Sequence, residues 1–583
     1  MMKNSVSNRE IRFKFRVNNK VYEKIFNQNY IDEFCEIKQI IHHESNTTKL
    51  SLSIIPHTEI LIEALEIKLD YTFNQDDLIY VNGYQSWTDS KEFFIDDKMN
   101  HLSKLATPLL NHYQFDKYGD YTFKKYSRLA GDFHGYTYGY IRNGKILNLI
   151  ASLTEKNGYT IINTSTSKHR IVIEKECKNL TIDSEYQAFD LLFMTDEENE
   201  VFDTYFNMMK IDKPKALPMT GWTSWYNYYQ NINEEIILKN VYALKKANKN
   251  IDIIQVDDGY QENIGDWLDI NPNKFPNGMK VIADKIHQSG YKAGIWLAPF
   301  VCETNSTIFK EHNDWILRNK NGELVLAGSN WSRFYALNLE LVEVKQYLRK
   351  VFEIVLNEWG FDLVKLDFLY AVCIESQSNK TRGQIMCEAM EFLRECVNDK
   401  LILACGVPLG PSFGLVDYCR IGCDVGLDWD DKFYMHFFHR ERVSTLNAIN
   451  NSMSRRHLNE RAFLNDPDVL FLRDENIQLS KTQKETLAFV NKHFGSLIFT
   501  SDDISLYTNQ DVLFDQTMTK DKTSIIEFTP KRNGVIELKY NYNSRNYLAY
   551  INLSSKQQAN LEAYETKVVE IKEEVYGSLK IDI

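Results

Sequence analysis

The pattern of apolar and polar residues changes twice along the chain, and its first part alternates in short runs. From about residue 10 to residue 200, apolar side chains occupy every second position in segments such as residues 11–17 and 159–163. A period of two is typical of strands with one buried face, and Asn, Gly and Asp between the segments are typical of turns. We therefore predict an N-terminal β-supersandwich over residues 1–205, an antiparallel sandwich larger than an immunoglobulin domain.

A different pattern begins near Lys213 and Pro214, where continuous apolar runs alternate with segments of helical spacing. Continuous runs indicate strands buried on both faces, whereas residues 233–250 and 343–359 carry apolar side chains at the spacing of amphipathic helices. The predicted strands are residues 219–225, 251–258, 292–299, 363–369, 401–408, 418–425, 463–472 and 497–501. This alternation predicts a central (β/α)8 TIM barrel over residues 206–502, with an inserted loop around residues 313–338. A doubly wound sheet is the competing fold, but no GxGxxG motif follows the first strand.

The last part of the chain returns to short alternating segments. Residues 535–540 and 547–551 each place apolar side chains two positions apart. This pattern predicts a C-terminal antiparallel β-domain over residues 503–583. The expected fold class is therefore multidomain, with an α/β barrel between two all-β parts.

Composition and charge limit the kinds of partner. The chain has 583 residues, a net charge of −12 and 13% aromatic residues. The negative charge argues against nucleic acid as the main partner, because phosphate binding needs clustered Lys and Arg. The first 20 residues are polar, the nine cysteines form no CxxC pair, and no apolar run is long enough to span a bilayer. These features predict a cytoplasmic protein with reduced thiols and no membrane association.

A charged pair interrupts the largely apolar predicted strand over residues 363–369. Lys365 and Asp367 stand two positions apart within Leu-Val-Lys-Leu-Asp-Phe-Leu, so both side chains point to the same side of the strand. Burying an unpaired charge is costly, so the pair needs a reason. One interpretation is a structural ion pair. The other is a nucleophilic carboxylate at the mouth of a barrel, kept ionised by the ammonium group.

Polar and aromatic residues collect at the carboxyl ends of the predicted strands, where the active sites of TIM barrels lie. In strand order they are Trp225 and Tyr226, Asp257 and Asp258, Trp296, Lys365 and Asp367, Cys405, and Arg420 and Asp424. Carboxylates accept hydrogen bonds from several hydroxyl groups, and rings stack on sugar faces, so the set predicts a site for a neutral carbohydrate. Asp367 and Asp424 are on different strands and are candidates for the two carboxylates of a glycosidase.

Two further motifs have both a structural and a functional interpretation. Asn82-Gly83 predicts a turn that presents Trp87 on a loop. The residues alone favour a ring folded back on the sandwich over a ring that reaches a neighbouring pocket. His436-x-x-His439 offers too few ligands for zinc and is interpreted as a surface or core feature. We find no P-loop or GxSxG motif, and we expect neither a metal nor another cofactor.

These segments resemble glycoside hydrolase family 36, the α-galactosidase family, over essentially the whole chain. The motifs that carry the resemblance are NGYQSW at 82–87, GWTSWY at 221–226, QVDDG at 255–259, GIWLAP at 294–299, KLD at 365–367 and RIGCD at 420–424. LNDPD at 464–468 and FTSDD at 499–503 also look like family signatures, with structural roles. The likeness is closest to the shorter bacterial and archaeal type, although Cys423 stands where some relatives have Pro or Ser.

The resemblance implies a function and a role for each site residue. It implies a retaining exo-α-galactosidase that acts on α-galactoside oligosaccharides, with Asp367 as the nucleophile and Asp424 as the acid/base. Asp257 and Asp258 would bind the O4 and O6 hydroxyls of galactose. Further substrate contacts are implied for Trp296, Lys365, Cys405, Arg420, Trp225, Tyr226 and Trp87.

Three alternative functions remain open from the sequence. An α-N-acetylgalactosaminidase would differ only in the pocket around C2 of the sugar. An α-galactosyl transferase of the raffinose-synthase kind would share the fold and the nucleophile. A sugar-binding pseudoenzyme need not keep both Asp367 and Asp424, so the intact pair argues against it. A homo-oligomer is possible but cannot be predicted from these patterns.

Overall fold

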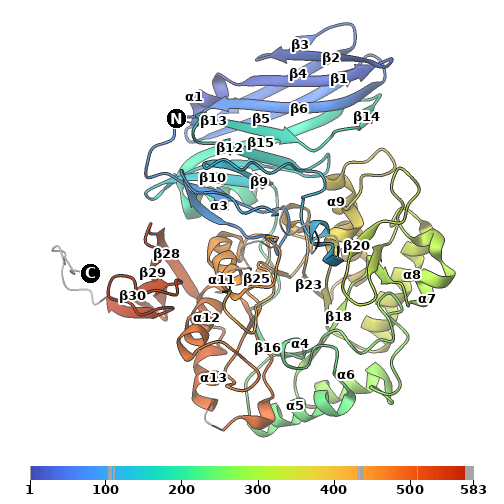
Figure 1. The fold of residues 1–583 in the computed structure, drawn as a ribbon, viewed down its shortest axis with the longest axis vertical. Helices are drawn as coiled ribbons and strands as arrows, with labels where there is room; N and C mark the ends of the chain where they lie inside the picture. Colours follow the sequence, from blue (N-terminus) through green and yellow to red (C-terminus); the bar gives the residue numbers. More distant parts are fainter. Residues whose placement is uncertain are drawn as a thin grey trace.

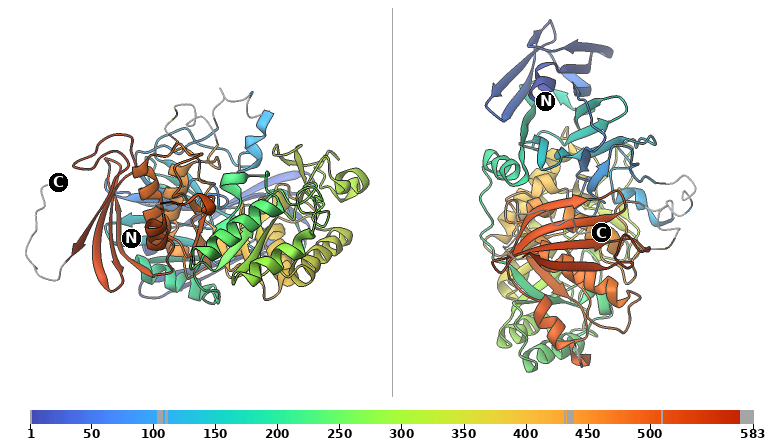
Figure 2. Two further views of the ribbon diagram at one scale, coloured as in Figure 1. Left: turned by 90° about the horizontal axis from the view of Figure 1, so that it is seen from below. Right: turned by 90° about the vertical axis from the view of Figure 1, so that its left-hand side faces the viewer.

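The computed structural model describes residues 2–102, 108, 112–430, 432, 439–508 and 510–571. It consists of an N-terminal β-rich part, a central barrel and a C-terminal sheet (Figure 1). The N-terminal sheets lie on one side of the barrel and the C-terminal sheet packs beside it, as the turned views also show (Figure 2). This architecture confirms the predicted fold class. The exact domain boundaries, at residues 205 and 502, remain a proposal.

The N-terminal part is built from two antiparallel sheets. The first follows the order β2-β1-β6-β13-β12-β9, with β14 paired to β6, and the second follows the order β3-β4-β5-β15-β11-β10-β7-β8. The strands of the first sheet are β1 (Glu10–Val17), β2 (Lys20–Phe26), β6 (Ile60–Asp70), β9 (Asp132–Tyr136), β12 (Thr160–Ser165), β13 (Arg170–Lys175) and β14 (Thr181–Ile182). Those of the second are β3 (Tyr30–Ile31), β4 (Cys35–His43), β5 (Thr47–Pro56), β7 (Leu78–Val81), β8 (Lys91–Phe94), β10 (Tyr138–Asn143), β11 (Ile146–Ser152) and β15 (Tyr186–Glu197). The alternating pattern explains the packing, because every second side chain of β1 is buried against residues of the second sheet.

The central sheet is parallel and closes into a barrel. Its strands follow the order β25-β24-β23-β22-β18-β17-β16-β27-β26. They are β16 (Met219–Thr223), β17 (Ile253–Val256), β18 (Lys292–Leu297), β22 (Leu363–Leu366), β23 (Leu401–Ala404), β24 (Tyr418–Arg420), β25 (Leu464–Asp466), β26 (Val469–Leu470) and β27 (Leu497–Thr500). The two ends of this order, β25 and β26, are consecutive pieces of the seventh predicted strand, so the sheet returns to its starting point. Pro467, which lacks an N–H, and the left-handed Asp468 (φ 79°) separate these two pieces.

Amphipathic helices surround the barrel. The longer ones are α5 (Glu234–Lys246), α6 (Gly278–Gln288), α8 (Val342–Glu353), α9 (Arg382–Val397), α11 (Thr445–Ser454) and α12 (Lys481–Phe494). Helix α5 begins where its sequence predicts, because the Asn233 side chain caps it by accepting a hydrogen bond of 2.8 Å from the Ile236 N–H. The predicted helix over residues 343–359 is α8 followed by a π-turn over Ile354–Glu358. Helix α3 (Glu198–Met208) connects the sandwich to the barrel.

Shorter helices and two small sheets complete the described part of the chain. The shorter helices are α1 (Met2–Ser7), α4 (Trp225–Tyr228), α7 (Thr307–Glu311), α10 (Leu409–Ser412) and α13 (Asp511–Thr517). The insertion after β18 contains β19 (Val301–Glu303), β20 (Leu326–Gly328) and β21 (Phe334–Ala336) in one antiparallel sheet. The C-terminal sheet contains β28 (Thr523–Pro530), β29 (Val535–Tyr542), β30 (Arg545–Asn552) and β31 (Thr566–Ile571), in sequence order.

One loop of the N-terminal part enters the barrel domain. It follows β7 and is held by the side chain of Arg455, which is fully buried. The guanidinium donates hydrogen bonds to the carbonyl oxygens of Gln85 (3.1 Å), Ser86 and, on the barrel side, Ile421 (2.7 Å). The Ser86 N–H also donates to the Val407 carbonyl oxygen at 2.8 Å. These bonds fix the loop that carries Trp87 against the ends of the barrel strands.

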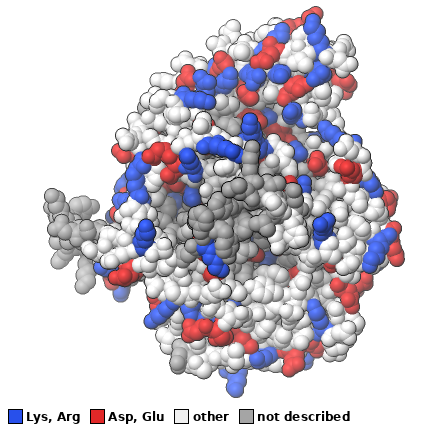
Figure 3. All heavy atoms as spheres, in the orientation of Figure 1, with Lys and Arg blue, Asp and Glu red and all other residues white. Residues whose placement is uncertain are grey.

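The outer face of the sandwich carries charges of both signs. Arg12 pairs with Glu23 at 2.8 Å, and Arg16 pairs with Glu63 at 2.7 Å, in each case across neighbouring strands. Figure 3 shows blue and red side chains interleaved on this part of the visible face. All nine cysteines lie in the described ranges and are free thiols. Within those ranges, every helix is too short or too polar to cross a bilayer.

Candidate active site

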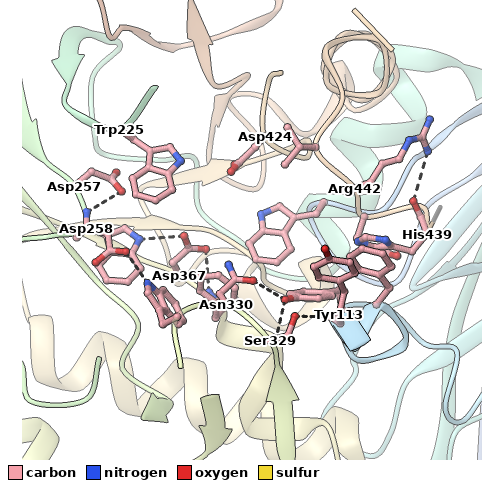
Figure 4. A pocket seen from close by; sticks show the side chains of 18 of the residues that line it. Tyr113, Trp225, Asp257, Asp258, Ser329, Asn330, Asp367, Asp424, His439 and Arg442 are labelled. Atoms are coloured by element: carbon pink, nitrogen blue, oxygen red, sulfur yellow. Dashed lines mark hydrogen bonds between the residues drawn. The ribbon is translucent and has the colours of Figure 1, made fainter. Parts of the chain in front are cut away.

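A pocket of about 360 Å³ opens at the carboxyl ends of the barrel strands. This volume lies within the range of small-molecule sites. Its lining includes seven of the residues predicted from the strand ends, namely Trp225, Asp257, Asp258, Trp296, Lys365, Asp367 and Asp424, together with Trp87. Figure 4 shows Asp257 and Asp258 toward one end of the pocket, with Asp367 and Asp424 between them and His439.

Asp367 follows directly after β22 and is 9% exposed. Its backbone N–H donates to the Leu297 carbonyl oxygen at 2.8 Å, which continues the pairing of β22 with β18. The indole Nε1–H of Trp296 donates to Oδ2 at 3.0 Å, and the Phe368 N–H donates to Oδ1 at 2.9 Å. One donor per oxygen orients the carboxylate and leaves lone pairs for a reacting atom.

Opposing effects set the pKa of Asp367. Burial has the largest effect and raises this pKa above its ordinary value, while the charge of Lys365 lowers it. The nearby charge of Asp424 raises it again, and the hydrogen bond from Trp296 lowers it. The net shift is upward, so the ammonium group of Lys365 does not determine the outcome alone.

The residue after Asp367 has an uncommon backbone conformation. Phe368 has φ 53°, in the left-handed region, which is costly for a bulky side chain. Its ring is enclosed by Trp87 and Trp331, each with its centroid 5.2 Å away, and by Phe334 at 5.1 Å. This packing stabilises the conformation, in which the Phe368 N–H reaches the carboxylate of Asp367.

Lys365 makes its close ion pair with a different carboxylate from the one next to it in sequence. Its Nζ lies 2.8 Å from Oδ2 of Asp257, on the loop after β17, and both side chains are buried. Burial alone would lower the pKa of Lys365, but the carboxylates of Asp257 and Asp367 outweigh it and raise this pKa. Lys365 therefore forms a buried ion pair with Asp257 and also lowers the pKa of Asp367. A structural ion pair and an electrostatic effect on Asp367, the two interpretations of this lysine from the sequence, are thus compatible.

Asp257 and Asp258 are buried and almost saturated with hydrogen bonds. Asp257 accepts from Lys365, from Gln255 Nε2 at 3.1 Å and from the Asp258 N–H at 3.0 Å. Asp258 accepts from Gln230 at 2.9 Å, Gln261 at 2.6 Å and the Trp331 indole at 2.9 Å. Burial raises the pKa of Asp258, and these three donors lower it. A carboxylate has about four acceptor positions, so each retains about one for a ligand hydroxyl.

Asp424 is the more accessible member of the carboxylate pair, because 34% of its side chain is exposed. Arg420 holds its Oδ1 at 3.0 Å and also contacts Asp466 Oδ2 at 3.0 Å. A third carboxylate, Asp468, lies 2.8 Å from Arg420 in the geometry of an ion pair rather than of a hydrogen bond. Burial raises the pKa of Asp468 to about 7, although Arg420 opposes this. Asp466 and Asp468 belong to the LNDPD motif, which here anchors Arg420.

Three of the predicted site residues lie behind the lining of the pocket. Tyr226 donates its hydroxyl hydrogen bond to Asp468, and Arg420 is buried among its three carboxylates. Cys405 accepts a hydrogen bond of 3.2 Å from the indole of Trp87, and burial raises its pKa well above the ordinary value, so it remains a thiol. Their direct contact with substrate remains a prediction, whereas Trp87 itself lines the pocket.

Several lining residues were not predicted from the sequence. Trp331, Ser329 and Asn330 come from the insertion after β18, and its length was the available signal, because long insertions often carry function. Others, which no motif indicated, are Tyr113, Phe115, Tyr118, Phe368, Glu441, Arg442 and Val443. His439 is in the pocket wall, while His436 lies outside the described residues. In the described ranges, no three His, Cys, Asp or Glu side chains form a group that could hold a metal ion.

The hydrogen bond from Trp296 should tune the pH dependence of the site. A nucleophilic carboxylate must be ionised, so if Asp367 is the nucleophile, as the sequence predicts, activity is lost as pH falls through its pKa. Since the Trp296 N–H lowers that pKa, Trp296→Phe should move the acidic limb of kcat/KM to higher pH. The matched control is Trp267→Phe, because Trp267 packs on Trp296 but its Nε1 has no partner among the described residues. An acidic limb that stays in place or moves downward in Trp296→Phe would contradict this role.

Comparison with known proteins identifies similarity to glycoside hydrolases. The melibiase family model matches residues 208–392. The α-galactosidase AgaA of Geobacillus stearothermophilus is 31% identical over 105 residues, which are 17% of this chain and 14% of that protein. An α-galactosidase of Escherichia coli is 30% identical over 151 residues, which are 25% of this chain and 20% of that protein. The sequence matches thus span a small part of each curated relative.

The fold extends the similarity to nearly the whole chain. TtGalA, an α-galactosidase from Thermus thermophilus solved with p-nitrophenyl α-D-galactopyranoside, superposes with a TM-score of 0.69 at 22% identity. That superposition covers 89% of this chain and 98% of the Thermus chain. With a melibiase match in its barrel, α-galactosidases among its curated relatives and their fold over nearly its whole length, this chain is similar to the α-galactosidases of glycoside hydrolase family 36.

Proposed function

We propose that the protein is a retaining exo-α-galactosidase that removes terminal non-reducing α-galactosyl residues. The observation that carries the proposal is the pair Asp367 and Asp424, which follow different strands, β22 and β24, and line the same pocket. Asp367 is buried and oriented by hydrogen bonds, which favours the role of nucleophile. Asp424 is more exposed, which favours the role of an acid/base group that exchanges protons with water. A retaining pair requires about 5–5.5 Å between the carboxyl groups.

The reaction proceeds in two displacements. Asp367 attacks the anomeric carbon while Asp424 gives its proton to the glycosidic oxygen, so the bond to the leaving group breaks and a β-galactosyl ester forms. Asp424, now a carboxylate, takes a proton from water as the water attacks the same carbon. The ester bond breaks, and galactose leaves in the α configuration. Asp367 is regenerated as a carboxylate and Asp424 as an acid.

The buried acidic end of the pocket fits the galactosyl group. Asp257 and Asp258 each keep about one acceptor position, which suits hydrogen bonds from the O4 and O6 hydroxyls. Their other positions are filled by protein donors, which fixes the direction of the remaining one and favours an axial O4. The Thermus relative has also been solved with stachyose, which supports an α-galactoside oligosaccharide as the substrate class here.

The proposal is tested by comparing kcat/KM on p-nitrophenyl α-galactoside and on its 2-acetamido analogue, with product analysis when sucrose is present. We expect cleavage of the plain galactoside and free galactose as the main product. A preference for the acetamido sugar would assign the protein as an α-N-acetylgalactosaminidase. Transfer of galactose mainly to sucrose would assign it as a transferase, and cleavage of neither substrate would overturn the proposal.

A further inference from the structure

The end of the pocket away from Asp257 and Asp258 is built differently from the galactose end. Figure 4 shows Tyr113 and His439 there, on the far side of Asp367 and Asp424. If galactose occupies the acidic end, as the proposed function requires, the group on the other side of the scissile bond must extend toward these rings. This inference therefore rests on the proposed function and concerns the leaving-group side of the same site.

Four rings form a continuous, nearly parallel stack at this end. The ring centroids of Tyr113 and Phe115 are 5.3 Å apart, and those of Phe115 and His439 are 4.4 Å apart. His439 is followed by Tyr118 at 5.6 Å, with an interplanar angle of 26°. The imidazole is thus held between two aromatic faces, and all four residues line the pocket. Because its faces are covered, His439 can meet a ligand only through its ring edge, where its nitrogen atoms lie.

The imidazole of His439 has unused hydrogen-bonding capacity. The residue is only 6% exposed, and neither ring nitrogen has a hydrogen-bond partner among the described residues. Burial, with a smaller contribution from Arg442, lowers the pKa of His439 to about 3, so the ring is neutral at any working pH. A neutral imidazole has one N–H donor and one acceptor nitrogen. Since Nδ1 is buried without a partner, the proton is better placed on Nε2, where it can be donated.

A neighbouring amide adds a second donor at the same end. The hydroxyl of Tyr118 donates to Oδ1 of Asn330 at 2.8 Å, which fixes the amide oxygen on the protein side. The Nδ2 group of Asn330 has no partner in the part of the chain that the structure describes, and Asn330 lines the pocket. Rings with donors at their edges suit a ligand that carries several hydroxyl groups, rather than a purely apolar leaving group.

We propose that His439 is a specificity-determining residue of a leaving-group subsite, where its imidazole donates a hydrogen bond to a hydroxyl of a second sugar ring. The ring stack Tyr113–Phe115–His439–Tyr118 fixes the direction of that donor, and Asn330 supplies a further donor beside it. The subsite selects sugars over small alkyl leaving groups, since only sugars carry a hydroxyl that can satisfy the imidazole.

The test compares an α-1,6-linked galactosyl-glucose disaccharide with methyl α-galactoside, because both have alkoxide leaving groups. The readout is the ratio of kcat/KM for the disaccharide to kcat/KM for the methyl galactoside. His439→Phe keeps an aromatic ring in the stack but removes both nitrogen atoms. The ratio should fall about 3- to 10-fold in this variant, as expected for loss of one hydrogen bond in the transition state.

Two further variants make the result decisive. His439→Leu has no hydrogen-bonding group in its side chain and should show the same fall, so it carries the test if His439→Phe does not fold. His493→Phe is the matched control, because His493 also has a pKa lowered to about 3, mainly by burial, but lies on α12 outside the pocket. An unchanged ratio in both His439 variants would overturn the subsite while leaving the proposed function in place. If the wild type cleaves neither galactoside, the proposed function itself fails.

Discussion

Asp367→Ala should abolish hydrolysis of α-galactosides, with kcat reduced by at least about 10³-fold, because the variant has no group to form the covalent intermediate. The fold should survive, since the hydrogen bonds from Trp296 and the Phe368 N–H are made to a side chain in the pocket lining, whereas the backbone N–H of residue 367 still pairs with Leu297. The measurement is the steady-state rate on p-nitrophenyl α-galactoside, together with thermal unfolding of both proteins. Activity above a few per cent of the wild type would remove Asp367 from the role of nucleophile.

The matched control for this substitution is at the other end of the same strand. Asp362 immediately precedes β22, at the amino end of the barrel strands, where it accepts hydrogen bonds from the Ala293 N–H at 2.9 Å and from His287 at 2.8 Å. Catalytic residues of TIM barrels lie at the carboxyl ends, and the amino ends serve stability. Asp362→Ala should therefore lower the thermal midpoint without loss of kcat comparable to that of Asp367→Ala.

Asp424→Ala should lose activity in proportion to how much the leaving group needs a proton. For alkyl and sugar galactosides we expect a loss of about 10²- to 10⁴-fold, the usual contribution of general acid–base catalysis. A dinitrophenyl leaving group departs without a proton, so its first step should be affected far less. Rates on a series of leaving groups of different pKa provide the measurement.

Added azide gives a second readout for Asp424→Ala. The truncated side chain leaves room for a small anion on the face from which water normally attacks, and azide needs no base to react. It should attack the galactosyl ester, break the bond to Asp367, and yield α-galactosyl azide at an increased rate. Asp428→Ala is the control, because Asp428 pairs with Lys432 at 3.1 Å and does not line the pocket. Equal losses on good and poor leaving groups, with no response to azide, would argue against the acid/base role.

The sequence predicted the barrel well because its strands obey a simple rule. Strands buried on both faces need continuous apolar runs, and each predicted run contains an observed strand. The sequence predicts one strand over residues 463–472, whereas Pro467 and the left-handed Asp468 separate this segment into β25 and β26. The position of the polar residues at the carboxyl ends of the strands could be predicted equally well, because the topology of this fold determines where its active sites lie.

Contacts between distant segments could not be predicted in the same way. The sequence spacing suggested that Lys365 serves Asp367, yet its ammonium group reaches Asp257, 108 positions away. Trp87 lines the barrel pocket because Arg455 ties its loop to the barrel, a contact across 369 positions to Ser86. His439 was interpreted as structural, and only the folded chain shows that it is stacked between Phe115 and Tyr118 in the pocket wall. Each case depends on tertiary packing, which local periodicity does not encode.

The stereochemistry of the first product tests the proposed mechanism most directly. Proton NMR of the wild-type enzyme, recorded within seconds to minutes of adding an α-galactoside, resolves the two anomers of galactose before they interconvert. Two displacements at Asp367 and Asp424 require that α-galactose appears first and β-galactose only later. If β-galactose appears first, a single displacement by water has occurred, and the assignment of Asp367 as a covalent nucleophile is wrong.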